Sequence, residues 1–137
     1  MLPAEPRAMR NGTNDPELER LTYATIGAAI EVHRNLGPGY LESVYEEALA
    51  IEFQSRGIQY VRQLQVSVEY KGHPVGTGTL DFLVDNRLVV ELKAVESLAP
   101  IHTAQVISYL KATKCKMGLL INFTETTLRS GMKRIVL

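Results

Sequence analysis

Three ionisable residues in the middle of the chain have types and a spacing that could support metal chemistry. Asp81 ends a stretch with strand-like alternation, and Glu91 and Lys93 follow on the next such stretch. In residues 88–94 every second side chain is apolar, so Glu91 and Lys93 point together to the opposite face of that strand. Charges on an otherwise apolar strand need partners, because desolvating an isolated charge costs several kcal/mol.

A hairpin between the two strands would bring the carboxylates together. Residues 85–87, Asp-Asn-Arg, suit a three-residue turn that pairs Val84 with Leu88. This register places Asp81 directly opposite Glu91, at the distance of a cross-strand pair. Two facing carboxylates repel each other unless they share a proton or a cation. The spacing therefore predicts that Asp81 and Glu91 share a proton or a cation.

Oxygen ligands of this kind favour a hard divalent cation. Mg²⁺ and Mn²⁺ both prefer carboxylate oxygens, so the sequence predicts a Mg²⁺ or Mn²⁺ site at Asp81 and Glu91. Lys93 lies two residues along on the same face, within reach of a water molecule or a phosphate oxygen. The alternative is a cross-strand cluster of ion pairs that satisfies itself and has no further role.

The elements that must position these residues follow from hydrophobic periodicity and turn signals. The expected order is ααβββαβ, an α/β fold with a mixed sheet flanked by helices. The apolar run 117–123 fits a strand covered on both faces. The ranges are helices over residues 15–36, 41–56 and 101–114, strands over 58–70, 75–84, 88–95 and 117–123, and a short turn or helix before a small strand at 133–136.

Two packing expectations follow from the same periodicities. The second helix should bury an apolar face made of Leu41, Val44, Tyr45, Ala48 and Ile51. In the second strand, Leu80, Phe82 and Val84 should share one face, which leaves Asp81 on the other.

Length and composition indicate one globular unit. The chain has 137 residues, of which 45% are hydrophobic and 22% charged, and we expect a loose tail over residues 1–12 and one domain over residues 13–137. No apolar run is long enough to span a membrane, and the first dozen residues contain no apolar signal core. The single cysteine, Cys115, is expected to be a buried thiol. A reducing, cytoplasmic setting follows.

Charge is distributed unevenly although the net charge is zero. Residues 1–68 contain six Lys and Arg against nine Asp and Glu, giving −3, and residues 69–137 contain nine against six, giving +3. The basic half could contact phosphate, with Lys111, Lys114 and Lys116 as candidates, although a solvated helix end and ordinary surface variation explain the same pattern.

Asp81, followed by Glu91-x-Lys93, resembles the PD-(D/E)xK nuclease signature, with Leu80 where a proline often stands. Gly39-Tyr40-Leu41-Glu42-Ser43-Val44-Tyr45 resembles the motif of the GxxExxY family, a group of small bacterial and archaeal proteins. The resemblance covers about residues 18–137. Other segments typical of that family are 29–33 (AIEVH), 37–39 (GPG), 45–49 (YEEAL), 90–95 (VELKAV), Gln105-x-x-x-Tyr109-Leu110 and 118–123 (GLLINF).

This resemblance implies a restriction-endonuclease-like core and a nuclease activity. It places Glu42 near Asp81 and Glu91 as a further metal ligand, although a glutamate in the first turn of a helix is favourable without any metal. Gln105 and Tyr109 are similar to the Q-x-x-x-Y element that borders the active site of related nucleases, and their spacing puts them on one helical face.

The predicted activity is therefore hydrolysis of nucleic-acid phosphodiester bonds. Asp81 and Glu91, assisted by Glu42, would hold one or two ions that acidify water and neutralise charge on the phosphoryl oxygens. Lys93 would position the attacking water or stabilise the transition state, and Gln105 and Tyr109 would orient Lys93 or contact the nucleic-acid backbone. We expect DNA as the substrate over RNA, no membrane association, and a homodimer because so small a protein offers little surface to a duplex.

Two other functions remain open at this point. The chain could be an accessory module that binds nucleic acid or protein and retains the nuclease fold without cutting. It could also hydrolyse a small phosphate ester. His33 lies on the apolar stripe of the first helix, where a hydrogen-bonded core histidine is the favoured interpretation.

Overall fold

The computed structural model describes residues 13–137, so the predicted tail over residues 1–12 lies outside the described residues. The expected order of elements is confirmed, and the short turn or helix and the small strand expected at the end of the chain are a 3₁₀ helix and a fifth strand. The elements are α2 (Pro16–Leu36), α3 (Glu42–Ser55), β1 (Tyr60–Tyr70), β2 (His73–Val84), β3 (Leu88–Lys93), α4 (Pro100–Thr113), β4 (Met117–Asn122), η1 (Leu128–Gly131) and β5 (Met132–Val136).

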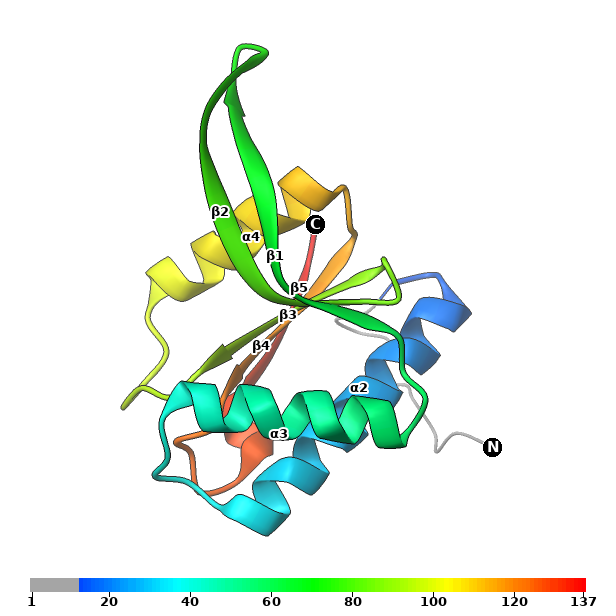
Figure 1. The fold of residues 1–137 in the computed structure, drawn as a ribbon, viewed down its shortest axis with the longest axis vertical. Helices are drawn as coiled ribbons and strands as arrows, with labels where there is room; N and C mark the ends of the chain where they lie inside the picture. The colour runs from blue at the N-terminus through cyan, green and yellow to red at the C-terminus, as the bar shows by residue number, and fades with distance from the viewer. Residues whose placement is uncertain (1–12) are drawn as a thin grey trace.

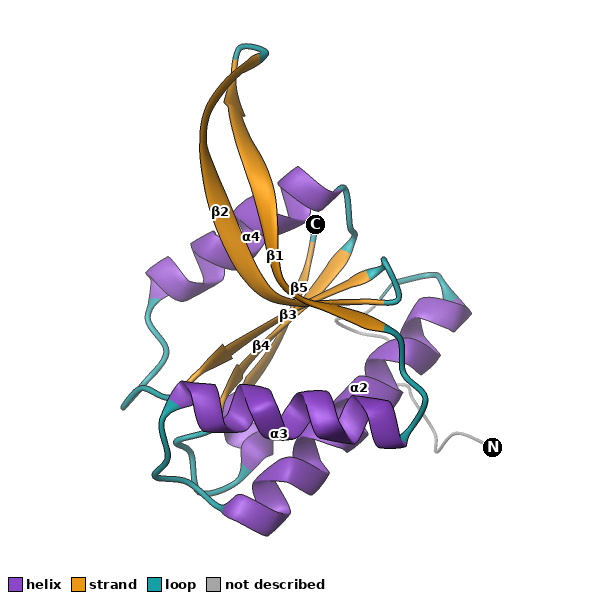
Figure 2. Ribbon diagram, in the orientation of Figure 1, coloured by secondary structure: helices purple, strands orange, loops and turns teal. Residues whose placement is uncertain are grey.

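The five strands form one mixed sheet in the order β1-β2-β3-β4-β5. Strands β3 and β4 are parallel, which requires a crossover, and α4 supplies it, whereas the other neighbours are antiparallel. Helices α2 and α3 lie on one side of the sheet and α4 lies on the other (Figure 2). The predicted α/β fold with a mixed sheet flanked by helices is confirmed.

Each face of the sheet has its own apolar core. The core beneath α2 and α3 contains Phe82, Val90 and Phe123, and the core beneath α4 contains Val89, Leu110 and Leu120. All six residues of β4 are buried, as expected for a strand covered on both faces.

Capping signals fix the ends of α2 as the sequence predicts. The Asp15 side chain accepts hydrogen bonds from the backbone N–H groups of Glu17 and Leu18, both at 3.1 Å, and Pro16 occupies the first helical position. Gly37 ends the helix with a φ of 69°, a conformation that favours glycine. No helix within residues 13–137 combines the length and apolar character needed to span a bilayer.

The buried face of α3 differs from the prediction. Leu41, Val44 and Ile51 are 75%, 37% and 61% exposed. Tyr45 is buried as expected: its ring stacks on Phe123 at a centroid distance of 4.5 Å, and its hydroxyl donates to the Gly37 carbonyl oxygen at 2.6 Å. Tyr45, Leu49, Ala50 and Phe53 form the buried face.

The predicted hairpin register between β2 and β3 is confirmed. Val84 pairs with Leu88 and Phe82 pairs with Val90, across a turn at residues 85–87. The hairpin of β1 and β2 continues past the body of the molecule (Figure 1), and its outer residues are exposed on both strands.

One prediction about β2 is wrong. Leu80 packs in the core beneath α4, whereas Phe82 and Val84 pack in the core beneath α2 and α3. The regular alternation is interrupted between Leu80 and Phe82, at Asp81. On β1 the matching position is Gln63, whose φ of 50° is left-handed. The side chains of β2 therefore switch from one face of the sheet to the other at Asp81, the predicted metal ligand.

Candidate active site

Strands β2 and β3 separate immediately after the pair Phe82–Val90, and the two predicted carboxylates fill the gap. The backbone N–H of Asp81 donates to Glu91 Oε1 at 2.6 Å, and the backbone N–H of Leu92 donates to Asp81 Oδ2 at 2.8 Å. Asp81 is 8% exposed and Glu91 is 3% exposed. One oxygen of each carboxylate thus accepts a backbone N–H of the opposite strand, where a carbonyl oxygen would accept it in a regular ladder. The second oxygen of each carboxylate does not take part in this pairing.

Burial and mutual repulsion dominate the electrostatics of this pair. Burial, followed by the negative charge of Asp81, raises the pKa of Glu91 from its ordinary value of 4.5 to about 8. Burial also raises the pKa of Asp81, and the hydrogen bond from the Leu92 N–H opposes that rise. The pair therefore favours a shared proton or a shared cation.

Glu42 is the first residue of α3, and the helix brings it towards the pair. Burial raises the pKa of Glu42, the charge of Asp81 raises it further, and the charge of Lys93 lowers it. The sequence-predicted Glu42, Asp81, Glu91 and Lys93 are therefore brought together within range of one another's charges.

Lys93 is half-buried at the end of β3 beside these three carboxylates. Its positive charge lowers the pKa of Glu42, Asp81 and Glu91 alike. Within residues 13–137, its ammonium group forms no ion pair within 4.0 Å. The lysine is thus close to the carboxylates without being held by any one of them.

Helix α4 brings Gln105 and Tyr109 to the same region. The Tyr109 hydroxyl donates to the Thr79 carbonyl oxygen at 2.9 Å. Burial raises the pKa of Tyr109, and the charges of Glu91 and Asp81 raise it further, while Gln105 beside the phenol lowers it. Tyr109 therefore lies within charge range of the two carboxylates, and Gln105 lies beside Tyr109.

Two residues of the site were missed by sequence reasoning. Gln63 Nε2 donates to Glu46 Oε1 at 2.6 Å and to Asp81 Oδ1 at 3.3 Å. The charge of Glu46 also raises the pKa of Asp81. The spacing of Glu42 and Glu46, one helical turn apart, could have identified Glu46. Gln63 gave no sequence signal, because its contact depends on a left-handed backbone inside a strand.

Residues 19–135 match the family model of the PD-(D/E)XK nuclease superfamily. The chain belongs to that superfamily. No curated protein shows significant sequence similarity to the chain. Membership in the PD-(D/E)XK superfamily supports a nuclease-type function acting on nucleic acid, and the mixed sheet with its flanking helices is consistent with the restriction-endonuclease-like fold.

Two other candidates lie outside the PD-(D/E)XK site. His33 is 8% exposed, and its Nε2 lies 2.8 Å from the Glu125 carbonyl oxygen. The interpretation of His33 as a hydrogen-bonded core residue is therefore confirmed. Cys115 is a buried free thiol, also as expected.

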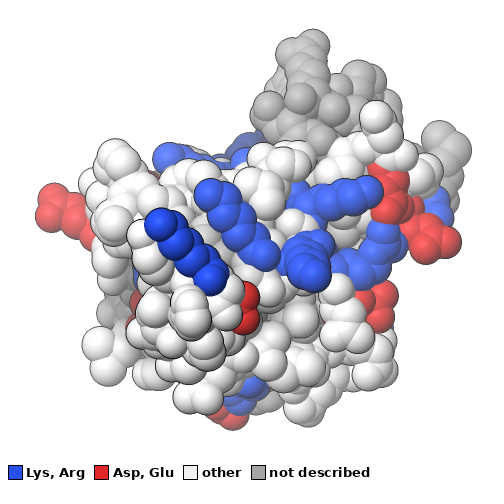
Figure 3. All heavy atoms as spheres, turned by 90° about the horizontal axis from the view of Figure 1, so that it is seen from above, with Lys and Arg blue, Asp and Glu red and all other residues white. Residues whose placement is uncertain are grey.

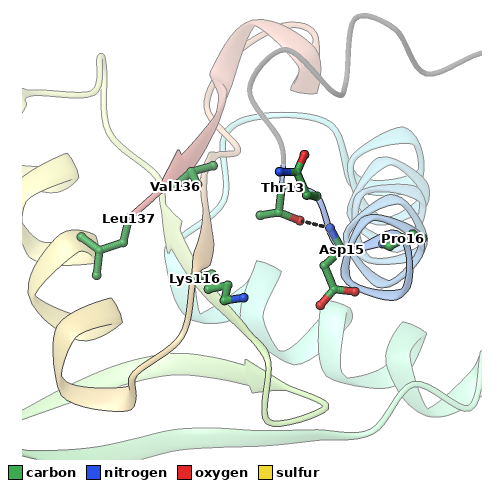
Figure 4. A pocket seen from close by; sticks show the side chains of 7 residues that line it. Thr13, Asp15, Pro16, Lys116, Val136 and Leu137 are labelled. Carbon is green, nitrogen blue, oxygen red and sulfur yellow. Dashed lines mark hydrogen bonds between the residues drawn. The ribbon is translucent and has the colours of Figure 1, made fainter.

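Two surface hollows lie away from Asp81 and Glu91. One is lined by residues 13–16 at the start of α2, by Lys116 just before β4, and by Val136 and Leu137 at the end of β5 (Figure 4). A neighbouring hollow shares Asp15 and Lys116 and also contacts Arg87 and Cys115. Neither hollow contains Glu42, Asp81, Glu91, Lys93, Gln105 or Tyr109, whereas both contain Lys116 and the second also contains Lys114, two of the candidate phosphate contacts.

The donor set at the PD-(D/E)XK motif suits a hard divalent cation. Carboxylate oxygens are the ligands that Mg²⁺ and Mn²⁺ prefer, and in residues 13–137 no hydrogen bond reaches Glu91 Oε2. In the same part of the chain, no group of three or more His, Cys, Asp or Glu side chains is arranged to hold a metal ion. Glu42 thus lies within charge range of Asp81 and Glu91 without completing a three-ligand group.

Proposed function

We propose that this protein is a metal-dependent nuclease that hydrolyses nucleic-acid phosphodiester bonds. One observation carries the proposal: two buried carboxylates, Asp81 and Glu91, lie beside Lys93, which forms no ion pair among residues 13–137, in a chain of the PD-(D/E)XK nuclease superfamily. An isolated structural cluster would be expected to pair its lysine directly with a carboxylate, because an unpaired half-buried charge is unfavourable.

The cation would be held by Asp81 and Glu91, with Glu42 assisting. When bound, a divalent cation supplies positive charge at the scissile phosphate and acidity to the attacking water. The raised pKa of Glu91 supports this assignment, because a cation removes the repulsion that now favours the protonated carboxyl. We assign no preference between Mg²⁺ and Mn²⁺.

Lys93 provides the second part of the proposed chemistry. Its ammonium group stabilises the negative charge that develops on the phosphoryl oxygens in the transition state. Tyr109, fixed by its hydrogen bond to the Thr79 carbonyl oxygen, and Gln105 beside it hold the substrate backbone or orient the lysine. The proposed catalytic residues are thus Asp81, Glu91, Lys93, Gln105 and Tyr109.

The proposed substrate is DNA. Figure 3 shows Lys and Arg side chains gathered on the face seen from above, and Lys111, Lys114 and Lys116 are exposed at the end of α4 and the turn that follows. Positive charge on one face attracts a phosphate backbone. We further propose one cytoplasmic domain over residues 13–137, a homodimer, and membership of the GxxExxY group.

Cleavage by the Asp81→Asn variant tests this proposal. Wild type and variant are incubated with single-stranded and duplex DNA and RNA in Mg²⁺, Mn²⁺ or EDTA, with Asp85→Asn as the matched control on the same hairpin. We expect metal-dependent cleavage by wild type and Asp85→Asn, and none by Asp81→Asn. If Asp81→Asn cuts as well as wild type, the proposal is wrong. A wild-type protein that neither cuts nor is stabilised by metal would favour the accessory module.

A further inference from the structure

Gln63 has a backbone conformation that is unusual for its position. Its φ of 50° lies in the left-handed region, which residues other than glycine rarely adopt. Among residues 13–137 it is the only non-glycine residue with this conformation inside a strand. The others lie in turns or at a helix end: Lys71, Asp85, Asn86 and Lys114. Such a conformation persists only when its surroundings hold it.

The side-chain amide of Gln63 supplies contacts that could hold this conformation. Its Nε2 donates to Glu46 Oε1 at 2.6 Å and to Asp81 Oδ1 at 3.3 Å. The other Asp81 oxygen, Oδ2, accepts the backbone N–H of Leu92 at 2.8 Å. Both oxygens of Asp81 are therefore oriented, one by the backbone of β3 and one by Gln63.

Glu46 is itself fixed, so the amide of Gln63 is anchored from the α3 side. Arg62 donates to Glu46 Oε2 at 2.8 Å, and the Glu46 side chain is only 12% exposed. A continuous series of contacts thus runs from Arg62 through Glu46 and Gln63 to Asp81. This series connects α3 and β1 to the carboxylate on β2.

We infer that Gln63 is a positioning residue that orients the Asp81 carboxylate for a divalent cation. The inference rests on the proposed function, because it assigns Asp81 as the ligand. If this position served only to interrupt the alternation of the strand, any residue that tolerates the left-handed region would suffice, and glycine tolerates it better than glutamine. The amide explains why a glutamine occupies this position. Groups that orient a metal ligand typically change metal affinity by about 10–100-fold when they are removed.

The test is a calorimetric titration of Mn²⁺ into wild type, Gln63→Met and Gln63→Gly. Methionine keeps the length of the side chain and removes the amide, whereas glycine also removes the steric cost of the left-handed backbone. We expect both variants to bind Mn²⁺ about 10–100-fold more weakly than wild type. Similar losses of Mn²⁺ affinity in the two variants would show that the missing amide is responsible, because Gln63→Met keeps the steric cost of the left-handed backbone and Gln63→Gly does not.

Gln65→Met is the matched control, because Gln65 is an exposed glutamine two positions along β1 and no hydrogen bond in residues 13–137 connects it to the site. It should bind Mn²⁺ like wild type. Wild-type affinity in Gln63→Met or Gln63→Gly would overturn the inference and leave the proposed nuclease intact. A wild-type protein that neither binds Mn²⁺ nor cuts would overturn the proposed function, and the inference with it.

Discussion

Glu91 is the residue whose ionisation is most strongly changed by the fold. Burial and the Asp81 charge raise its pKa to about 8, so in the absence of a cation the carboxyl is mostly protonated at pH 7. The proton and a divalent cation would satisfy the same pair of carboxylates. Binding of a cation should therefore release a proton.

This pKa predicts how stability depends on pH in the absence of metal. Between pH 4.5 and about 8 the folded protein binds more protons at Glu91 than the unfolded chain does, so the free energy of unfolding should fall as pH rises through this window. The loss should be on the order of a few kcal/mol. Urea unfolding in EDTA at several pH values measures it.

Glu91→Gln is the variant that isolates this effect. The glutamine keeps an oxygen for the Asp81 N–H but cannot ionise. Its unfolding free energy should change much less over the same pH range and exceed that of wild type at pH 8. A wild-type protein whose stability rises steadily from pH 5 to pH 8 would contradict the assignment.

Lys93 allows binding and catalysis to be separated. Lys93→Ala removes the ammonium group from the proposed transition state, so kcat should fall about 10²–10³-fold. Mn²⁺ affinity should be retained or increase, because a positive charge near the carboxylates is lost. Lys133→Ala, at an exposed position of β5, is the control. Unchanged kcat in Lys93→Ala would exclude the proposed role.

At the scale of elements, the contact between β2 and α4 holds Tyr109 in the site. A Cβ built on Gly78 would lie 2.9 Å from Tyr109 Cε1, whereas a Cβ on Gly76 meets no atom within 4 Å. Tyr109 is 8% exposed and is fixed by its bond to the Thr79 carbonyl oxygen. The ring therefore has little freedom to move away, and glycine at position 78 permits the close approach.

Gly78→Ala should consequently destabilise the protein and displace Tyr109. Overpacking of this kind costs about 1–3 kcal/mol, and the displaced ring should also lower cleavage activity. Gly76→Ala, two residues away on the same strand, should change the unfolding free energy by less than about 0.5 kcal/mol. Urea unfolding and cleavage rates of the two variants make the comparison. Equal effects of the two substitutions would contradict this account.

The sequence was most informative about elements with regular local patterns. The cap at Asp15 and the C-terminal Gly37 predicted the ends of α2, and the turn at residues 85–87 predicted the register that aligns Asp81 with Glu91. These features depend on short-range geometry that a few adjacent residues determine.

The features that the sequence did not predict depend on long-range contacts. The buried face of α3 is set by the stacking of Tyr45 on Phe123, a residue that lies far away in the sequence. Leu80 lies on the opposite face of the sheet from Phe82, next to the left-handed residue Gln63 on the neighbouring strand. The rule that every second side chain of a strand shares one face assumes a regular backbone, so it does not predict this interruption. Gln63 was missed for the same reason, whereas Glu46 carries a short-range signal in its spacing of one helical turn from Glu42.

At the scale of the whole molecule, the site lies between the two helical layers. Helix α3 approaches the separated ends of β2 and β3 from one side of the sheet, and α4 approaches from the other (Figure 2). A buried ion pair also ties the start of α2 to β5, with Arg134 Nη1 2.8 Å from Glu19 Oε1. Rigid elements on both faces suit a site whose ligands must stay oriented.

The central claim is that Asp81 and Glu91 together hold a divalent cation. The most direct test is calorimetric titration of Mn²⁺ into wild type and Asp81→Asn at pH 7, in two buffers of different ionisation enthalpy. We expect saturable binding with proton release in wild type, thermal stabilisation by Mn²⁺, and loss of both in Asp81→Asn. A wild-type protein that shows neither binding heat nor stabilisation at millimolar Mn²⁺ would contradict this claim.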